Sequence, residues 1–177
     1  AAHPRRLYAL HATKSPSMLR PQPQSVENAA HAILWAAPIA ELLVMYHGVL
    51  DAWWMADDSM LLLSAIRHGI IAHYVRPPDE LGLLSFNLTP WLYASYGIDF
   101  AVGGLNPKVA YVHHLISCVP TLAVLTMVLR RLLGAAVTAV VLVWFVLALP
   151  TSSLVLFLCM RHYVEGLLAA ALCVLAY

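Results

Sequence analysis

The chain has 177 residues, of which 62% are hydrophobic and only 11% are charged, and its mean hydropathy is +0.77. This composition excludes an ordinary soluble domain and is typical of a protein that crosses a membrane several times. The net charge of +1 gives no indication of a nucleic-acid partner.

The N-terminal segment is basic and rich in proline, serine and glutamine. It lacks the apolar stretch of a secretory signal, so we do not expect it to be a cleaved leader. We predict a flexible cytoplasmic tail over residues 1–28, followed by one transmembrane helical domain over residues 29–177.

Four apolar runs predict transmembrane helices, each of which needs about 20 residues. Pro107 stands at a helix-starting position, and Pro150 stops the third run. The last run is short, so we expect either that its helix begins before Arg161 or that the protein is longer. The predicted spans are residues 29–50, 107–129, 132–149 and 160–177.

Basic residues near the span ends set the expected orientation. The tail and the turn with Arg130 and Arg131 fall on the same side, which the positive-inside rule makes cytoplasmic. The loop over residues 51–106 then lies outside, and its charged residues are mainly acidic. We expect a bacterial inner (plasma) membrane protein with a cytoplasmic N-terminus.

The outer loop is more than a linker. Its residues 57–74 have apolar side chains at helical spacing, which predicts an amphipathic helix at the membrane interface. Trp91, Tyr93 and Tyr96 follow, and such rings settle at headgroup level. The expected fold is an all-α integral membrane protein with about four transmembrane helices and an interfacial amphipathic helix in the first outer loop.

Asp57 and Asp58 stand at the start of this amphipathic stretch. Neighbouring helical residues point about 100° apart, so both carboxylates cannot face one small target. The two aspartates therefore have different roles, or one of them has no role in a site. One could take a proton from an acceptor hydroxyl while the other, Asp58, holds a divalent metal ion. The alternative is that both only cap the following helix.

Several histidines fall near the outer ends of the spans. His47, His113 and His114 are candidate ligands for haem or chlorophyll, because a neutral imidazole is a good axial ligand. Equally, such polar tips commonly sit at headgroup level without a ligand. The three cysteines lie in apolar runs without metal-ligand spacing, and we predict no disulfide.

Arg161 and His162 belong to the densest polar group in the second half, residues 161–165. They are candidates for binding a phosphate at the membrane surface, although lipid headgroups are an alternative ligand. We expect this group to contact the acidic outer loop.

The order of these motifs resembles the N-terminal third of the C-type membrane glycosyltransferases. The resemblance covers residues 30–177: "WWMADDSMLL" after a first span, then "GLNPKVAYVHHLISCVPTLAVLTMVLRRLLG", then "LALPTSSLVLFLCMRHYVEGLL". It implies transfer of a sugar from a polyprenyl-phosphate carrier on the outer face.

The resemblance also implies roles for particular residues. An acidic residue of the first outer loop serves that family as base or metal ligand, which carries over to Asp57 and Asp58. Arg161 and His162 become candidates for holding the departing phosphate. Members have many more spans, so catalysis is expected of a longer chain, and these residues alone are expected to be inactive.

A second hypothesis belongs to a different class. The short length, the span-end histidines and small residues such as those in "LLAAALC" suit a non-catalytic accessory subunit of a larger energy-transducing or pigment-bearing membrane complex. Its partners would be the other subunits, whereas the enzyme would meet its lipid donor, with bound membrane lipids in both cases. A transporter or channel segment, suggested by Glu41 alone, ranks third.

Overall fold

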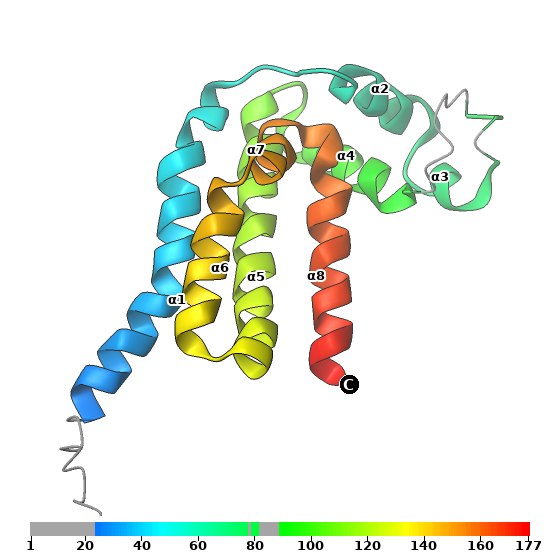
Figure 1. Ribbon diagram of the computed structural model, residues 1–177. Helices are drawn as coiled ribbons and strands as arrows, with labels where there is room; N and C mark the ends of the chain where they lie inside the picture. Colours follow the sequence, from blue (N-terminus) through cyan, green and yellow to red (C-terminus); the bar gives the residue numbers. More distant parts are fainter. Residues whose placement is uncertain (1–23, 78, 82–88) are drawn as a thin grey trace, which may run out of the picture.

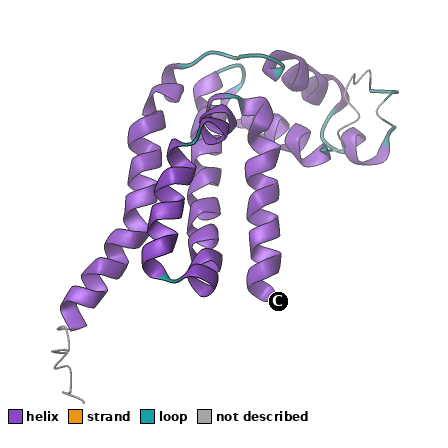
Figure 2. Cartoon of the chain, in the orientation of Figure 1, coloured by secondary structure: helices purple, strands orange, loops and turns teal. Residues whose placement is uncertain are grey.

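The computed structural model describes residues 24–77, 79–81 and 89–177, and within these ranges the chain is helical without a strand (Figure 1, Figure 2). Most of the predicted tail, up to residue 23, lies outside the described residues. The elements in chain order are α1 (Gln24–Tyr46), η1 (His47–Asp51), α2 (Asp58–His68), α3 (Ala72–Val75), α4 (Pro90–Gly103), α5 (Pro107–Leu133), α6 (Ala135–Leu147), α7 (Leu149–Leu156), η2 (Leu158–Met160) and α8 (Arg161–Ala176).

Three stretches of the described chain are long and apolar enough to cross a membrane: Ala32–Asp51, Pro107–Leu133 and Leu158–Ala176. A fourth crossing results if the bent pair α6 and α7 counts as one span. The predicted all-helical fold is confirmed for the described residues, and so is the presence of three to four helical segments that could cross a membrane. Among the described cysteines none forms a disulfide.

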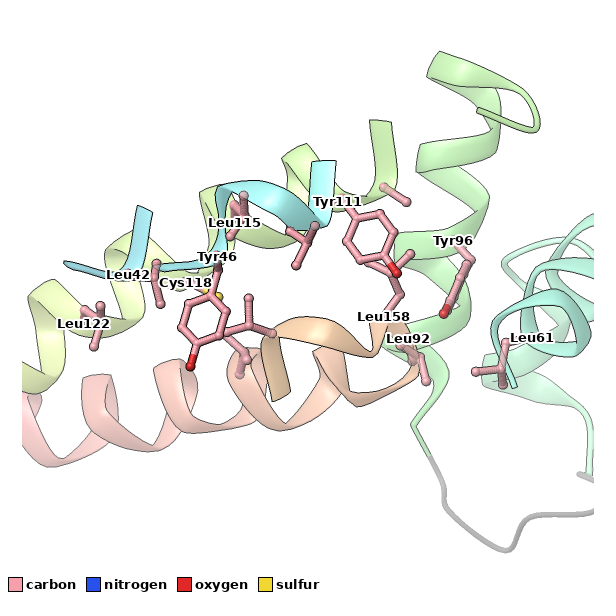
Figure 3. Close-up of a cluster of buried hydrophobic side chains, with 14 of the residues drawn as sticks. Leu42, Tyr46, Leu61, Leu92, Tyr96, Tyr111, Leu115, Cys118, Leu122 and Leu158 are labelled. Atoms are coloured by element: carbon pink, nitrogen blue, oxygen red, sulfur yellow. The ribbon is translucent and has the colours of Figure 1, made fainter. Parts of the chain in front are cut away.

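The long helices run side by side and alternate in direction (Figure 1). The turn between α5 and α6 lies at the same end of the bundle as the start of α1, and α2, α3 and α4 lie across the opposite end. We call these three helices the cap. A continuous row of buried side chains connects the bundle to the cap, from Leu122 and Leu42 through Tyr111 to Tyr96 and Leu61 (Figure 3).

The third crossing is broken rather than ended by Pro150. Helix α6 stops at Leu147, and α7 starts at once with Pro150 in its first turn, at an angle of 58°. Proline is tolerated in a first turn because its missing N–H would have no partner there. The sequence placed the end of the span near this proline but did not predict that a helix resumes at Leu149.

Side chains donate hydrogen bonds to backbone carbonyls at the end of α6 and in the last turn of α7. Tyr46 on α1 donates to Val146 O at 2.9 Å, and Thr151 donates to Phe145 O. Two side chains of α5, those of His114 and Tyr111, donate to carbonyl oxygens of α7. Such internal pairing is what a membrane requires, because lipid offers no hydrogen bonds to an open backbone.

The cap differs from the single amphipathic helix that the sequence predicted. Gly69, at φ +73°, ends α2 in a left-handed conformation that suits glycine, and the chain then turns into the short α3. Helix α4, with Pro90 in its first turn, is a further 14-residue helix that the aromatic pattern did not predict. Its Leu92, Tyr93 and Tyr96 are buried against the rest of the molecule.

The tight turn from α4 to α5 allows a direct test of this packing. A Cβ added to Gly103 would collide with the side chain of Val109 on α5, and valine has little rotamer freedom with which to move away. We expect Gly103→Ala to destabilise the fold by about 1–3 kcal/mol, read as a lower melting temperature in detergent. Gly166→Ala is the matched control, because a Cβ there meets nothing within 4 Å. Equal melting temperatures for the two variants would contradict this account.

Candidate functional site

The two neighbouring aspartates before α2 point in different directions. Asp57 is exposed, whereas Asp58 is 0% exposed. The chain turns here through Ala56, whose φ of +49° is unusual for a residue with a side chain and costs about 1–3 kcal/mol. The structure thus confirms that the two carboxylates cannot share one target, and it buries one of them.

Asp58 connects three parts of the chain through its carboxylate. Oδ2 accepts a hydrogen bond from the backbone N–H of Met55 at 2.9 Å. Oδ1 accepts from the Tyr96 hydroxyl at 2.8 Å and from the backbone N–H of Cys159 at 2.9 Å. Burial raises the pKa of Asp58, while these three donors and the charge of Arg161 act in the opposite direction. This carboxylate therefore fixes the α2 terminus to α4 and η2.

Arg161, the first residue of α8, is also 0% exposed. Its Nη1 donates to Asp99 Oδ2 at 2.7 Å, and its Nη2 donates to the carbonyl of Ala110 at 2.8 Å. The guanidinium carbon lies 5.6 Å from the centre of the Tyr96 ring, within range of a cation–π interaction. The expected contact between residues 161–165 and the acidic outer loop is confirmed.

Asp99 is held between two basic side chains. Its Oδ1 accepts from His113 Nδ1 at 2.7 Å, and its Oδ2 accepts from Arg161. Burial alone would raise the pKa of Asp99, but the hydrogen bond from His113 and the charge of Arg161 outweigh it and lower the pKa. The described network joins α4, α5 and α8.

A second contact runs parallel to the Asp99–Arg161 pair. Ser95 donates to Glu165 Oε1 at 2.9 Å. Each helix thus presents two polar residues four positions apart, on the same face, and the two pairs meet as rungs between α4 and α8. The sequence analysis assigned no site role to Ser95, Tyr96 or Asp99. The spacing of four residues between Ser95 and Asp99 matches that between Arg161 and Glu165. It was the sequence signal that would have paired Ser95 and Asp99 with α8.

The two residues predicted to bind phosphate lie in different environments. Arg161 is enclosed and already paired with Asp99. His162 is half-buried, and its Nδ1 donates to the carbonyl of Cys159 at 2.9 Å. Its ring lies 4.0 Å from that of Tyr163, which is 52% exposed. Of the two, His162 is the side chain closer to the surface.

The three histidines proposed as cofactor ligands do not converge. His47 is exposed and donates to Val44 O, His113 is bound to Asp99, and His114 is buried and donates from Nε2 to Leu154 O at 2.8 Å. Within the described residues, no group of three His, Cys, Asp or Glu side chains is arranged to hold a metal ion. The oxygens of Asp58, the predicted metal ligand, are both used as hydrogen-bond acceptors.

Comparison with protein-family models, curated proteins and solved structures gives no match for this chain.

Proposed function

We propose that this chain forms the front part of an integral membrane glycosyltransferase that moves a sugar from a polyprenyl-phosphate carrier to an acceptor at the outer surface of a bacterial inner membrane. The observation that carries the proposal is the exposed Asp57 beside the buried Asp58 at the capped end of the bundle. The resemblance of the motif order to C-type membrane glycosyltransferases supports the same reaction.

In this proposal Asp57 is the base. The acceptor hydroxyl gives its proton to the Asp57 carboxylate as its oxygen bonds to the anomeric carbon of the sugar. The bond from that carbon to the carrier phosphate breaks, and the phosphate leaves with the electron pair. Asp58 acts as a positioning residue, because its three hydrogen bonds fix the turn. His162 is favoured over the enclosed Arg161 for binding the departing phosphate, to which its Nε2 can donate only in the imidazolium form because Nδ1–H is given to Cys159 O.

The proposed setting also explains the exposed apolar side chains of the cap. Ile71 is 76% exposed, Val75 is 71% exposed and Trp91 is 40% exposed. Apolar side chains of transverse helices can lie in the headgroup region, as in an interfacial helix. Arg130 and Arg131 lie at the opposite end of α5 from the cap, which favours a cytoplasmic N-terminus under the positive-inside rule.

Asp57→Asn tests the proposed base. In membranes that contain the full-length protein of which this chain forms the front part, supplied with labelled polyprenyl-phosphate sugars, we expect transfer to fall by about 10²–10⁴-fold. Asp51→Asn, another exposed aspartate at the end of η1, should leave transfer unchanged, and both variants should keep the parent melting temperature. Full transfer by Asp57→Asn would rule out this role for the carboxylate.

A specific observation favours the accessory-subunit function as the second candidate. One face of α8 exposes only small residues, Gly166, Ala169, Ala170 and Cys173, and such faces allow transmembrane helices to approach closely. Purification in mild detergent separates the two functions: co-purification at a fixed ratio with other subunits, without any sugar transfer, would favour the subunit.

A further inference from the structure

His73 occupies an unusual place in the cap. It is only 8% exposed, although α3, which carries it, is one turn long. Its ring stacks on that of Tyr93 from α4, with 4.1 Å between centroids and 14° between planes. The same ring is within hydrogen-bond distance of Ser64 on α2 and of Gly69 at the end of α2. One imidazole therefore connects all three helices of the cap.

The hydrogen bond to Gly69 fixes which ring nitrogen of the docked His73 carries the proton. Gly69 offers a carbonyl oxygen 2.9 Å from His73 Nδ1, and a carbonyl can only accept, so Nδ1 carries the proton. Nε2 then holds a lone pair, which accepts from the Ser64 hydroxyl at 3.1 Å. This arrangement suits a neutral imidazole. A second proton on Nε2 would reverse this hydrogen bond, with the Ser64 hydroxyl as acceptor, and would place a net charge on the buried ring.

No carboxylate compensates a charge at this position among the described partners of His73. The titratable groups that face it are His68 from α2, 6.2 Å away edge-on, and Tyr93 from α4. On the packed elements, Arg67 is exposed on α2 and Arg76 is exposed just after α3, and Asp99 of α4 is paired with Arg161. A protonated His73 would be buried beside basic groups, with the Tyr93 ring face as its main attraction.

The pKa of His73 follows from this environment. Burial lowers it, the hydrogen bond to Gly69 raises it, and the charge of His68 lowers it, with a net shift below the ordinary value. Once α3 leaves the cap, the ring regains a pKa of about 6.5. The undocked state therefore binds the proton more readily. Docking is strongest above about pH 6.5 and weakens as the pH falls below that value.

The rest of the α3 contact is apolar and shallow. Ile70 lies so close to α4 that a Cβ on Gly97 would stand 2.7 Å from its Cγ1. Beside this contact an open groove of about 540 Å³ is lined by Ala65, Ile66, Gly69, Ile70, Ile71, Gly97 and Phe100. Ile71, Tyr74 and Val75 are largely exposed. Among the contacts of α3 within the described residues, the side-chain hydrogen bonds are those of the buried His73 imidazole.

We infer that Ser64, Gly69, His73 and Tyr93 form a pH-sensitive latch, in which protonation of His73 releases α3 from α4 and widens the groove between α2 and α4. The latch is independent of the proposed sugar transfer, since it uses none of the residues of the Asp57 site. The position of α3 within the cap would then depend on the pH of the solution on the cap side of the membrane.

Hydrogen exchange of the detergent-solubilised chain, measured by mass spectrometry and corrected for the intrinsic pH dependence, tests the latch. Between pH 7.5 and 5.5 we expect protection of the α3 amides to fall by up to about tenfold for the one pH unit below 6.5. His73→Phe keeps the stacked ring but cannot titrate, so its protection should be the same at both pH values. A flat profile in the parent chain, or an equal fall in His73→Phe, would overturn the latch.

Two further measurements keep the outcome unambiguous. Gly97→Ala should undock α3 at every pH by pushing Ile70 away, and it supplies the exchange pattern of the released state. If His73→Phe does not fold, the imidazole of the parent chain can be titrated by histidine-selective NMR. A His73 midpoint below 6.5, accompanied by changes in the Tyr93 signals, supports the latch, whereas a midpoint at or above 6.5 contradicts it.

Discussion

Replacing Arg161 with methionine is expected to lower the free energy of unfolding by about 3–5 kcal/mol, because the buried Asp99 carboxylate loses the guanidinium and keeps only its contact with His113. The guanidinium is 0% exposed and the Asp99 side chain 4% exposed, so water cannot replace the lost donor. The Ala110 carbonyl and the Tyr96 ring also lose their contact. Unfolding in mixed detergent micelles with increasing SDS, followed by tryptophan fluorescence, measures the loss.

The double variant Arg161→Met with Asp99→Asn separates charge burial from packing. It removes the Asp99 charge together with the guanidinium and should recover a substantial part of the stability, since replacing both members of a buried pair is often close to neutral. Arg161→Lys should recover less, because one ammonium group cannot donate in the fork geometry that reaches both Asp99 and Ala110. A double variant no more stable than Arg161→Met would show that lost packing, and not the unpaired carboxylate, causes the effect.

Asp58→Ala is expected to produce the second large loss, about 3–5 kcal/mol, because three donors lose a charged acceptor in a buried site. The loss should be concentrated in the cap, so limited proteolysis ought to cut near α2 before the long helices are attacked. Tyr96→Phe removes only one of the three donors and should cost about 1–2 kcal/mol.

Asp57→Ala is the matched control for Asp58→Ala, since the two residues are adjacent and differ mainly in exposure. It should change the free energy of unfolding by no more than about 0.5 kcal/mol. If both alanine variants lose the same stability, the assignment of a structural role to one carboxylate and a surface role to the other is wrong.

Much of the architecture could be predicted from the composition and from the positions of the prolines. Long apolar runs are a direct consequence of the thickness of a bilayer, and α5 begins at Pro107 because proline suits a helix start. The divergence of Asp57 and Asp58 followed from helix geometry alone. The restart of a helix at Leu149 could not be predicted, because the carbonyls at the bend and at the end of α7 are paired with side chains of α1 and α5, which lie far away in the sequence.

The candidate site was predictable only in part for a similar reason. The sequence indicated that residues 161–165 would meet the acidic loop, but the loop offered several carboxylates. The choice of Asp99 as the partner of Arg161 depends on the crossing of α4 and α8, and α4 itself was not predicted. The burial of Arg161 likewise arises from tertiary packing, which no local pattern around this residue encodes.

The bend between α6 and α7 has a consequence for biogenesis. Neither piece is long enough to enter lipid independently, with 13 and eight residues against the roughly 20 that a crossing needs. Tyr46 donates to the carbonyl of Val146 at the bend, and Tyr111 and His114 donate to carbonyls near the end of α7. All three donors are synthesised earlier than these carbonyls. The broken segment is therefore expected to leave the translocon only after the two preceding helices have assembled beside it, so that the ribosome delivers the donors before the acceptors.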